Sequence, residues 1–127
     1  MIIFTEYKKF IMDHFDWLCE EYNCEIRLAH DSVKIENHNA IMMMKGERYG
    51  TAVDCNFLIK VSGEKFNWWD YLLTKGWPDK VTEYNSEEKR ILNDLATDEV
   101  KANLYKKACV IKAEFQGIFG GKVKALI

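Results

Sequence analysis

Cysteine and histidine are the residue types in this sequence best suited to metal binding, and five of them could form a zinc site: Cys19, Cys24, His30, His38 and Cys55. Structural zinc sites usually contain ligand pairs at C-x-x-C or H-x₃₋₅-H spacing, because a tight turn must present two ligands at once. Neither spacing occurs here. We therefore expect no metal and no cofactor, and we interpret the cysteines as small apolar side chains of the core.

A nucleophilic cysteine would need a neighbouring base and a group that orients that base. Cys55 falls on the inward face of the longest predicted strand, and Cys109 falls beside core positions of the last predicted helix. His30 and His38 fall in predicted turns, where polar residues are common. An enzymatic function would gain support if His30, Asp31 and Cys55 converged in one pocket.

Paired carboxylates and a glycine-containing loop are also present, but neither has the arrangement that catalysis requires. Glu20-Glu21 and Glu87-Glu88 are adjacent in predicted helices, and adjacent helical residues do not converge on one point. Glu87 and Glu88 instead suit the first turn of a helix, where acidic side chains complement the helix dipole. The segment 46–50 lacks the Lys-Ser/Thr pair of a phosphate-binding loop. We predict that the protein is not an enzyme.

Hydrophobic periodicity indicates the elements that would position any site. Apolar residues recur every three or four positions from Tyr7 to Tyr22, which predicts a helix that Thr5 caps and Asn23 ends. An alternation of period two then predicts strands, separated by short polar links. These strands are Cys24–Leu28, Val33–Glu36, Ala40–Met44 and Thr51–Val61. Three short links between four strands favour an antiparallel meander.

Two helical segments are predicted after the sheet. Asn67 can cap a short helix, Trp68–Lys75, which Gly76 and Pro78 terminate. From Glu87 the helical pattern resumes and runs to about Phe119, with a bend near Thr97-Asp98. An apolar seam along its second part faces either the core or a partner: Val100, Leu104, Ala108, Ile111, Phe115 and Ile118.

The predicted fold class is α+β, in a single domain that spans residues 1–127. It contains the N-terminal helix, a four-stranded antiparallel meander, a short helix and a long, bent C-terminal helix. The first and the C-terminal helices cover one face of the sheet. Hydrophobic residues make up 48% of the chain, which is enough for a core. The predicted core contains Phe10, Phe15, Leu18, Ile26, Leu28, Val53, Phe57, Ile59, Leu104, Ile111 and Phe115.

Charge and hydropathy exclude several classes of partner. The formal net charge is −2 and the pI is about 5.9, whereas general nucleic-acid binding usually requires a basic excess. No apolar stretch approaches the roughly 20 residues of a membrane span. The start, Met1 to Glu6, lacks the features of a signal peptide. We therefore expect a cytoplasmic protein with reduced thiols that binds neither nucleic acid nor a membrane.

Two features point to a protein partner, and each has a plain structural alternative. Trp68, Trp69 and Trp77 lie close together in the chain, and they either cap the core or anchor a partner. Residues 79–99 contain seven acids and three bases, whereas residues 100–127 contain six lysines and one acid. This charge distribution represents either solvated helix faces that complement the dipole or an acidic patch that attracts a basic protein.

The order of elements resembles the small bacterial immunity proteins, which are cytoplasmic antidotes to polymorphic or contact-dependent toxins. The resemblance covers roughly residues 7–77: the leading amphipathic helix, the meander with Val33-Lys34-Ile35-Glu36-Asn37, and the block from Phe66 to Gly76. It implies a non-enzymatic inhibitor that occupies the active site of a toxin or a surface nearby. These families share no fixed binding residues, so the resemblance transfers none.

We therefore predict an immunity-type protein that binds a basic toxin domain by direct contact. The predicted contact residues are Trp69, Trp77, Asp79, Glu83, Glu87 and Asp94. The alternative is a homodimeric structural, adaptor or chaperone-like protein, in which the seam from Val100 to Ile118 pairs two copies. A monomer and a homodimer both remain open. Secretion chaperones are of similar size, but a helix typically divides their strands.

Overall fold

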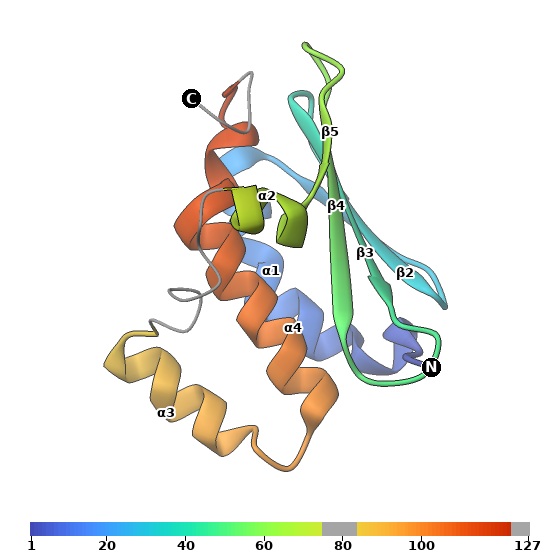
Figure 1. The fold of residues 1–127 in the computed structure, drawn as a ribbon, viewed down its shortest axis with the longest axis vertical. Helices are drawn as coiled ribbons and strands as arrows, with labels where there is room; N and C mark the ends of the chain where they lie inside the picture. Colours follow the sequence, from blue (N-terminus) through green and yellow to red (C-terminus); the bar gives the residue numbers. More distant parts are fainter. Residues whose placement is uncertain (75–83, 123–127) are drawn as a thin grey trace.

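A helix followed by an antiparallel sheet forms the first half of the chain (Figure 1). The computed structural model describes residues 1–74 and 84–122. A 3₁₀ turn, η1 (Phe4–Tyr7), leads into α1 (Lys8–Tyr22). The strands are β1 (Glu25–Leu28), β2 (Ser32–Glu36), β3 (Ala40–Gly46), β4 (Val53–Ile59) and β5 (Lys65–Asn67), which pair as a meander in chain order.

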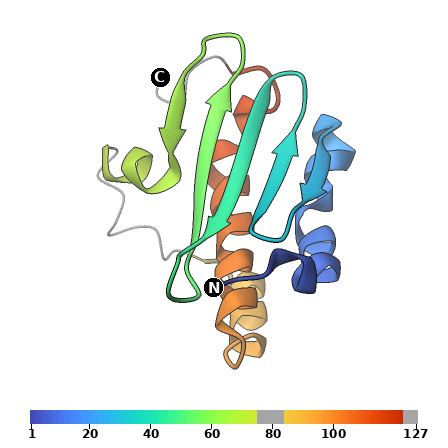
Figure 2. The same ribbon diagram turned by 90° about the vertical axis from the view of Figure 1, so that its right-hand side faces the viewer.

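Helices form the remainder of the described chain. They are α2 (Trp68–Thr74), α3 (Ser86–Asp94) and α4 (Glu99–Val110), followed by a π-helical turn, η2 (Ile111–Phe115), and a 3₁₀ turn, η3 (Gln116–Ile118). As we predicted, α1 and the C-terminal helix α4 lie on the same side of the sheet (Figure 1). Figure 2 looks onto the opposite face, over which no helix of residues 1–74 or 84–122 lies.

The ends of α1 differ in how well the sequence predicted them. Asn23 adopts the expected left-handed conformation (φ 56°), and its backbone N–H donates to the carbonyl of Cys19. The predicted cap at Thr5 is wrong, since the α-helix begins at Lys8. Phe4 is fully buried and its N–H donates to the carbonyl of His30 (3.0 Å), so these contacts hold the preceding residues in the separate turn η1.

The predicted four-stranded sheet has a fifth strand. β5 contains only three residues, too few for an alternation to show in the sequence, and it returns after a turn in which Gly63 has a φ of 71°. Phe66 of β5 pairs with Phe57 of β4, and the two rings stack with centroids 5.0 Å apart. The turn also ends β4 at Ile59, before the predicted end of the strand at Val61, which is 76% exposed.

The long C-terminal helix is divided near the predicted bend. α3 ends at Asp94 and α4 begins at Glu99, because Asp98 caps α4: its carboxylate accepts a hydrogen bond from the N–H of Lys101 (3.1 Å). The predicted seam then packs against the sheet, with Val100 partly buried and its other members buried. The seam is therefore part of the core of its own chain, so pairing of two copies would need another surface.

Most of the predicted core residues are buried. Phe15, Leu18, Val53, Phe57, Ile59, Leu104, Ile111 and Phe115 are at most 3% exposed. Phe10, Ile26 and Leu28 are only partly buried and pack against the edge of the core. Ile26 and Leu28 lie on the edge strand β1, which leaves one side of each open to solvent.

Asn37 is a buried polar residue at the end of the core where α1, the β2–β3 turn and the C-terminal turns meet. Its amide nitrogen donates to the carbonyls of Tyr22 (2.9 Å) and Phe119 (2.8 Å). Its amide oxygen accepts from the N–H groups of Asn39 (2.9 Å) and Ala40 (3.1 Å). These four hydrogen bonds connect segments from both ends of the described chain.

Candidate functional site

The cysteine and histidine candidates do not share a site. Cys55 is fully buried on the inward face of β4, as we predicted, whereas His30 and Asp31 are exposed in the β1–β2 turn. Within residues 1–74 and 84–122, no group of three or more His, Cys, Asp or Glu side chains is placed to hold a metal ion. The convergence of His30, Asp31 and Cys55 that would favour an enzyme is therefore not seen.

Burial also suppresses the reactivity of the thiols. It raises the pKa of Cys55 to about 12 and that of Cys24 to about 11. Burial, with a hydrogen bond to the Glu88 carboxylate, raises the pKa of Cys109 to about 12, and desolvation raises the pKa of Cys19 as well. Because the thiolate is the nucleophilic form, these thiols are weak nucleophiles at neutral pH.

Three of the six predicted contact residues belong to the part of the chain that the structure describes: Trp69, Glu87 and Asp94. Trp77, Asp79 and Glu83 lie outside the described residues. Trp69 belongs to α2, where it is 40% exposed, and it lines a cavity that reaches α4 at Lys107. Glu87 lines a different cavity, which reaches α4 at Cys109.

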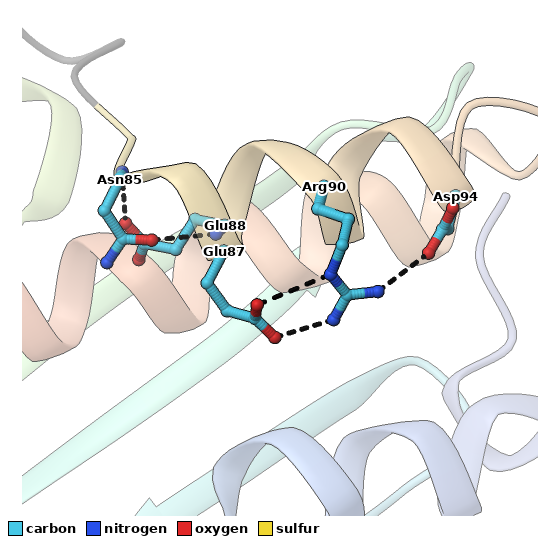
Figure 3. A network of polar contacts seen from close by, with 5 residues as sticks. All are labelled: Asn85, Glu87, Glu88, Arg90 and Asp94. Carbon is cyan, nitrogen blue, oxygen red and sulfur yellow. Dashed lines mark hydrogen bonds and ion pairs between the residues drawn. The ribbon is translucent and has the colours of Figure 1, made fainter.

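Exposed carboxylates of α3 are engaged within the helix itself (Figure 3). Arg90 bridges two predicted contact residues: its guanidinium nitrogens lie 2.6 Å from an oxygen of Glu87 and 3.3 Å from an oxygen of Asp94. The hydrogen bond with Arg90 lowers the pKa of Glu87. α3 has no buried residue, so these side chains all project from a helix that contributes little to the core.

The first turn of α3 is a capping box that we did not predict. The side chain of Asn85 accepts a hydrogen bond from the N–H of Glu88 (2.8 Å), and the carboxylate of Glu88 accepts one from the N–H of Asn85 (2.9 Å). The spacing Asn-x-x-Glu was the available signal. Glu87 and Glu88 do occupy the first turn, as we expected from the helix dipole.

The tryptophan-rich segment partly caps the core and partly faces solvent. Tyr71 and Leu72 are buried, and the ring of Tyr71 packs against that of Phe115, with centroids 4.9 Å apart. Trp68 is half-buried, and its neighbour Trp69 is exposed because successive helical residues point about 100° apart. Asn67 caps α2 as predicted, since its side-chain oxygen accepts from the N–H groups of Trp69 (2.9 Å) and Asp70 (3.3 Å).

Beside these tryptophans is an open cavity of about 780 Å³, within the size range of ligand-binding sites. It lies between α2, the ends of β3 and β4, and α4. Trp68 and Trp69 form its apolar wall, Asp54 and Asn67 lie on the sheet side, and Lys107 comes from α4. We refer to it as the tryptophan cavity.

Lys107 is the most unusual side chain of the tryptophan cavity. It is only 8% exposed, and its ammonium lies 3.8 Å from the ring centroid of Trp68, a cation–π contact. Desolvation by burial lowers the pKa of Lys107. From the charge pattern we expected a solvated lysine here, although its position three residues after Leu104 and four before Ile111 places it next to the seam.

Comparison with family models, with curated proteins and with solved structures finds no match for this chain. Across residues 1–74 and 84–122, no helix combines the length and the apolar character needed to cross a membrane.

Proposed function

We propose that this chain is a non-enzymatic protein-binding domain of the immunity type, which inhibits a toxin by direct contact in the cytoplasm. The observation that carries the proposal is Trp69, a large aromatic side chain that is 40% exposed beside an open cavity. Tryptophans in such positions are favoured as hot spots of protein interfaces. The raised pKa values of the four thiols add support, because they disfavour the most reactive side chains as nucleophiles.

The proposed partner is a toxin domain with a basic substrate groove. The exposed carboxylates of Glu87 and Asp94 can attract such a groove from a distance, although Arg90 compensates part of their charge. Trp69 would then supply contact energy, and α3 would supply electrostatic steering. Trp77, Asp79 and Glu83 stay in the proposed contact surface on the basis of sequence alone.

A binding experiment with the product of the neighbouring gene tests this proposal. We expect that product to be toxic and to bind the full chain at micromolar concentration or tighter in calorimetry. Trp69→Ala should weaken binding at least tenfold, the ordinary effect of removing a hot spot. Val61→Ala is the matched control, because Val61 is also exposed but lies in the β4–β5 turn.

Two results would each remove the immunity function: a neighbouring product without toxicity, or no binding at micromolar concentration. Equal affinities for Trp69→Ala and the unsubstituted chain would remove Trp69 from the contact surface. A change of equal size in Trp69→Ala and Val61→Ala would also count against a contact at Trp69, because it would indicate a general loss of structure.

A further inference from the structure

The Lys107 side chain is largely buried, and among the described residues its ammonium has no hydrogen-bond acceptor. It has three N–H donors, yet it makes no hydrogen bond or ion pair with any residue of 1–74 or 84–122. In the same residues, every side-chain nitrogen or oxygen that is fully shielded from solvent has a hydrogen-bond partner. The ammonium must therefore still reach solvent, and the tryptophan cavity that Lys107 lines is the opening available to it.

The acidic groups of the cavity do not neutralise this charge at contact distance. Asp54 lines the same cavity, but its carboxylate accepts hydrogen bonds from the side-chain amides of Asn67 (2.8 Å) and Asn56 (3.3 Å). Asp70 is exposed on α2. The face of Trp68 stabilises the cation from one side, but a ring offers no oxygen to the N–H donors.

We propose that the tryptophan cavity binds a carboxylate group, with the Lys107 ammonium as its counter-ion. This inference deepens the proposed function and rests on it for the source of the carboxylate. A buried, desolvated charge gains most from an opposite charge that hydrogen-bonds to it. The walls formed by Trp68 and Trp69 suit the apolar carbons that carry a carboxylate.

A monoanion fits this cavity better than a phosphate dianion. Three acidic residues, Glu47, Asp54 and Asp70, also line the cavity, and their repulsion grows with the charge of the ligand. A carboxylate carries one charge and two acceptor oxygens, which suits the three donors of the Lys107 ammonium; Lys45, which is exposed, also lines the cavity. An Asp or Glu side chain of the partner, its C-terminal carboxylate and a free carboxylic acid share this chemistry.

NMR titration of the ¹⁵N-labelled full chain with sodium acetate tests the inference, with sodium chloride at equal ionic strength as the reference. We expect saturable shifts of the indole N–H of Trp68 and of the side-chain amides of Asn67 and Asn103. The dissociation constant should lie in the millimolar range, which corresponds to a binding free energy of about −4 kcal/mol. Lys107→Met, which keeps the length of the apolar stem, should abolish them. Lys106→Met is the matched control, because Lys106 is exposed on α4 and does not line the cavity.

Short peptides distinguish the sources of the carboxylate. One acetylated, amidated tripeptide carries a central glutamate, a second replaces it by glutamine, and a third ends in a free carboxylate. Binding of the first but not the second indicates an acidic side chain, whereas preference for the third indicates a chain terminus. If the chain binds acetate but none of the three peptides, the ligand is a free acid. That result leaves the cavity site intact but separates it from the protein partner.

Equal shifts in acetate and chloride would overturn the inference, and so would acetate binding that survives Lys107→Met. If Lys107→Met does not fold, the acetate–chloride comparison and the glutamate–glutamine pair on the unsubstituted chain decide. Toxin binding that depends on Trp69 but not on Lys107 would refute the partner as the source of the carboxylate and leave the proposed function. Acetate binding by a chain that binds no toxin would refute the proposed function and leave the carboxylate site.

Discussion

Substitution of Asn37 tests the principal polar connection of the fold. Asn37→Ala removes two donors and one acceptor from a side chain that is 7% exposed. The carbonyl of Phe119 keeps a partner, since the side chain of Asn39 also donates to it (2.9 Å). The carbonyl of Tyr22 and the N–H groups of Asn39 and Ala40 lose the bonds that Asn37 supplies.

The expected loss of stability follows from these three groups. Ala40 is fully buried, so its N–H has little access to water. An unsatisfied buried group costs about 1–3 kcal/mol, and part of the loss at Tyr22 and Asn39 is recovered by hydration. We therefore expect Asn37→Ala to reduce the free energy of unfolding by about 3–5 kcal/mol, a large share of the roughly 5–15 kcal/mol typical of a domain.

Asn37→Asp separates the donors from the acceptor. The introduced carboxylate can still accept from Asn39 and Ala40, but it faces the carbonyl oxygens of Tyr22 and Phe119 without a proton to donate. The folded state therefore raises the pKa of the introduced carboxyl, so stability should increase as the pH falls through that raised pKa and should level off below the ordinary value for aspartate. We expect a loss similar to that of Asn37→Ala at neutral pH and partial recovery near pH 3, relative to the unsubstituted chain.

Urea denaturation followed by circular dichroism measures these differences. His38→Ala is the control, because His38 is exposed in the same turn and should change stability by less than about 0.5 kcal/mol. A loss below about 1 kcal/mol in Asn37→Ala, or unchanged stability of Asn37→Asp at neutral pH, would refute the role assigned to this side chain.

Three further substitutions have defined outcomes. Burial lowers the pKa of Lys107, so the folded chain holds that proton less tightly than the unfolded chain does. The free energy of unfolding should therefore rise as the pH increases toward 10.5. Urea denaturation should show this rise in the unsubstituted chain and not in Lys107→Met. Asn85→Ala removes the capping box and should destabilise α3 by about 1 kcal/mol. Amide hydrogen exchange in α3 should therefore be faster in this variant, whereas the control variant Asn93→Ala should not show the increase. Gly46→Ala places a Cβ 3.0 Å from Ile2 and should cost about 1–3 kcal/mol in urea denaturation, with partial recovery in the double variant with Ile2→Ala.

Local periodicity was sufficient to predict α1, α2 and the first four strands, because each has enough residues to show its period. It was insufficient where a tertiary contact decides the structure. η1 depends on the bond from Phe4 to the carbonyl of His30, and β5 depends on the pairing of Phe66 with Phe57. Both are contacts between segments that are separate in the sequence, so no pattern within either segment records them.

In the candidate site, too, local pattern predicts one residue and a tertiary contact decides another. Trp69 could be predicted as an exposed aromatic because adjacent tryptophans of a helix cannot both face the core. Lys107 could not be distinguished from the other C-terminal lysines by charge alone. Its burial results from the position of Trp68, which α2 places against α4. A charge count over 100–127 therefore gives a solvated basic segment and misses Lys107, a lysine whose environment is unusual.

Charge reversals in α3 and removal of the Lys107 charge should change different kinetic constants of toxin binding. Glu87→Lys and Asp94→Lys alter exposed charges, so they should slow association and flatten its salt dependence while dissociation stays similar. Lys107→Met removes a buried contact from the tryptophan cavity, so it should accelerate dissociation and leave the association rate within about threefold. Stopped-flow association at several salt concentrations, together with competition-driven dissociation, measures both constants. If Lys107→Met slows association as much as the α3 reversals do, Lys107 acts as one more surface charge and the division of roles between α3 and the cavity is wrong.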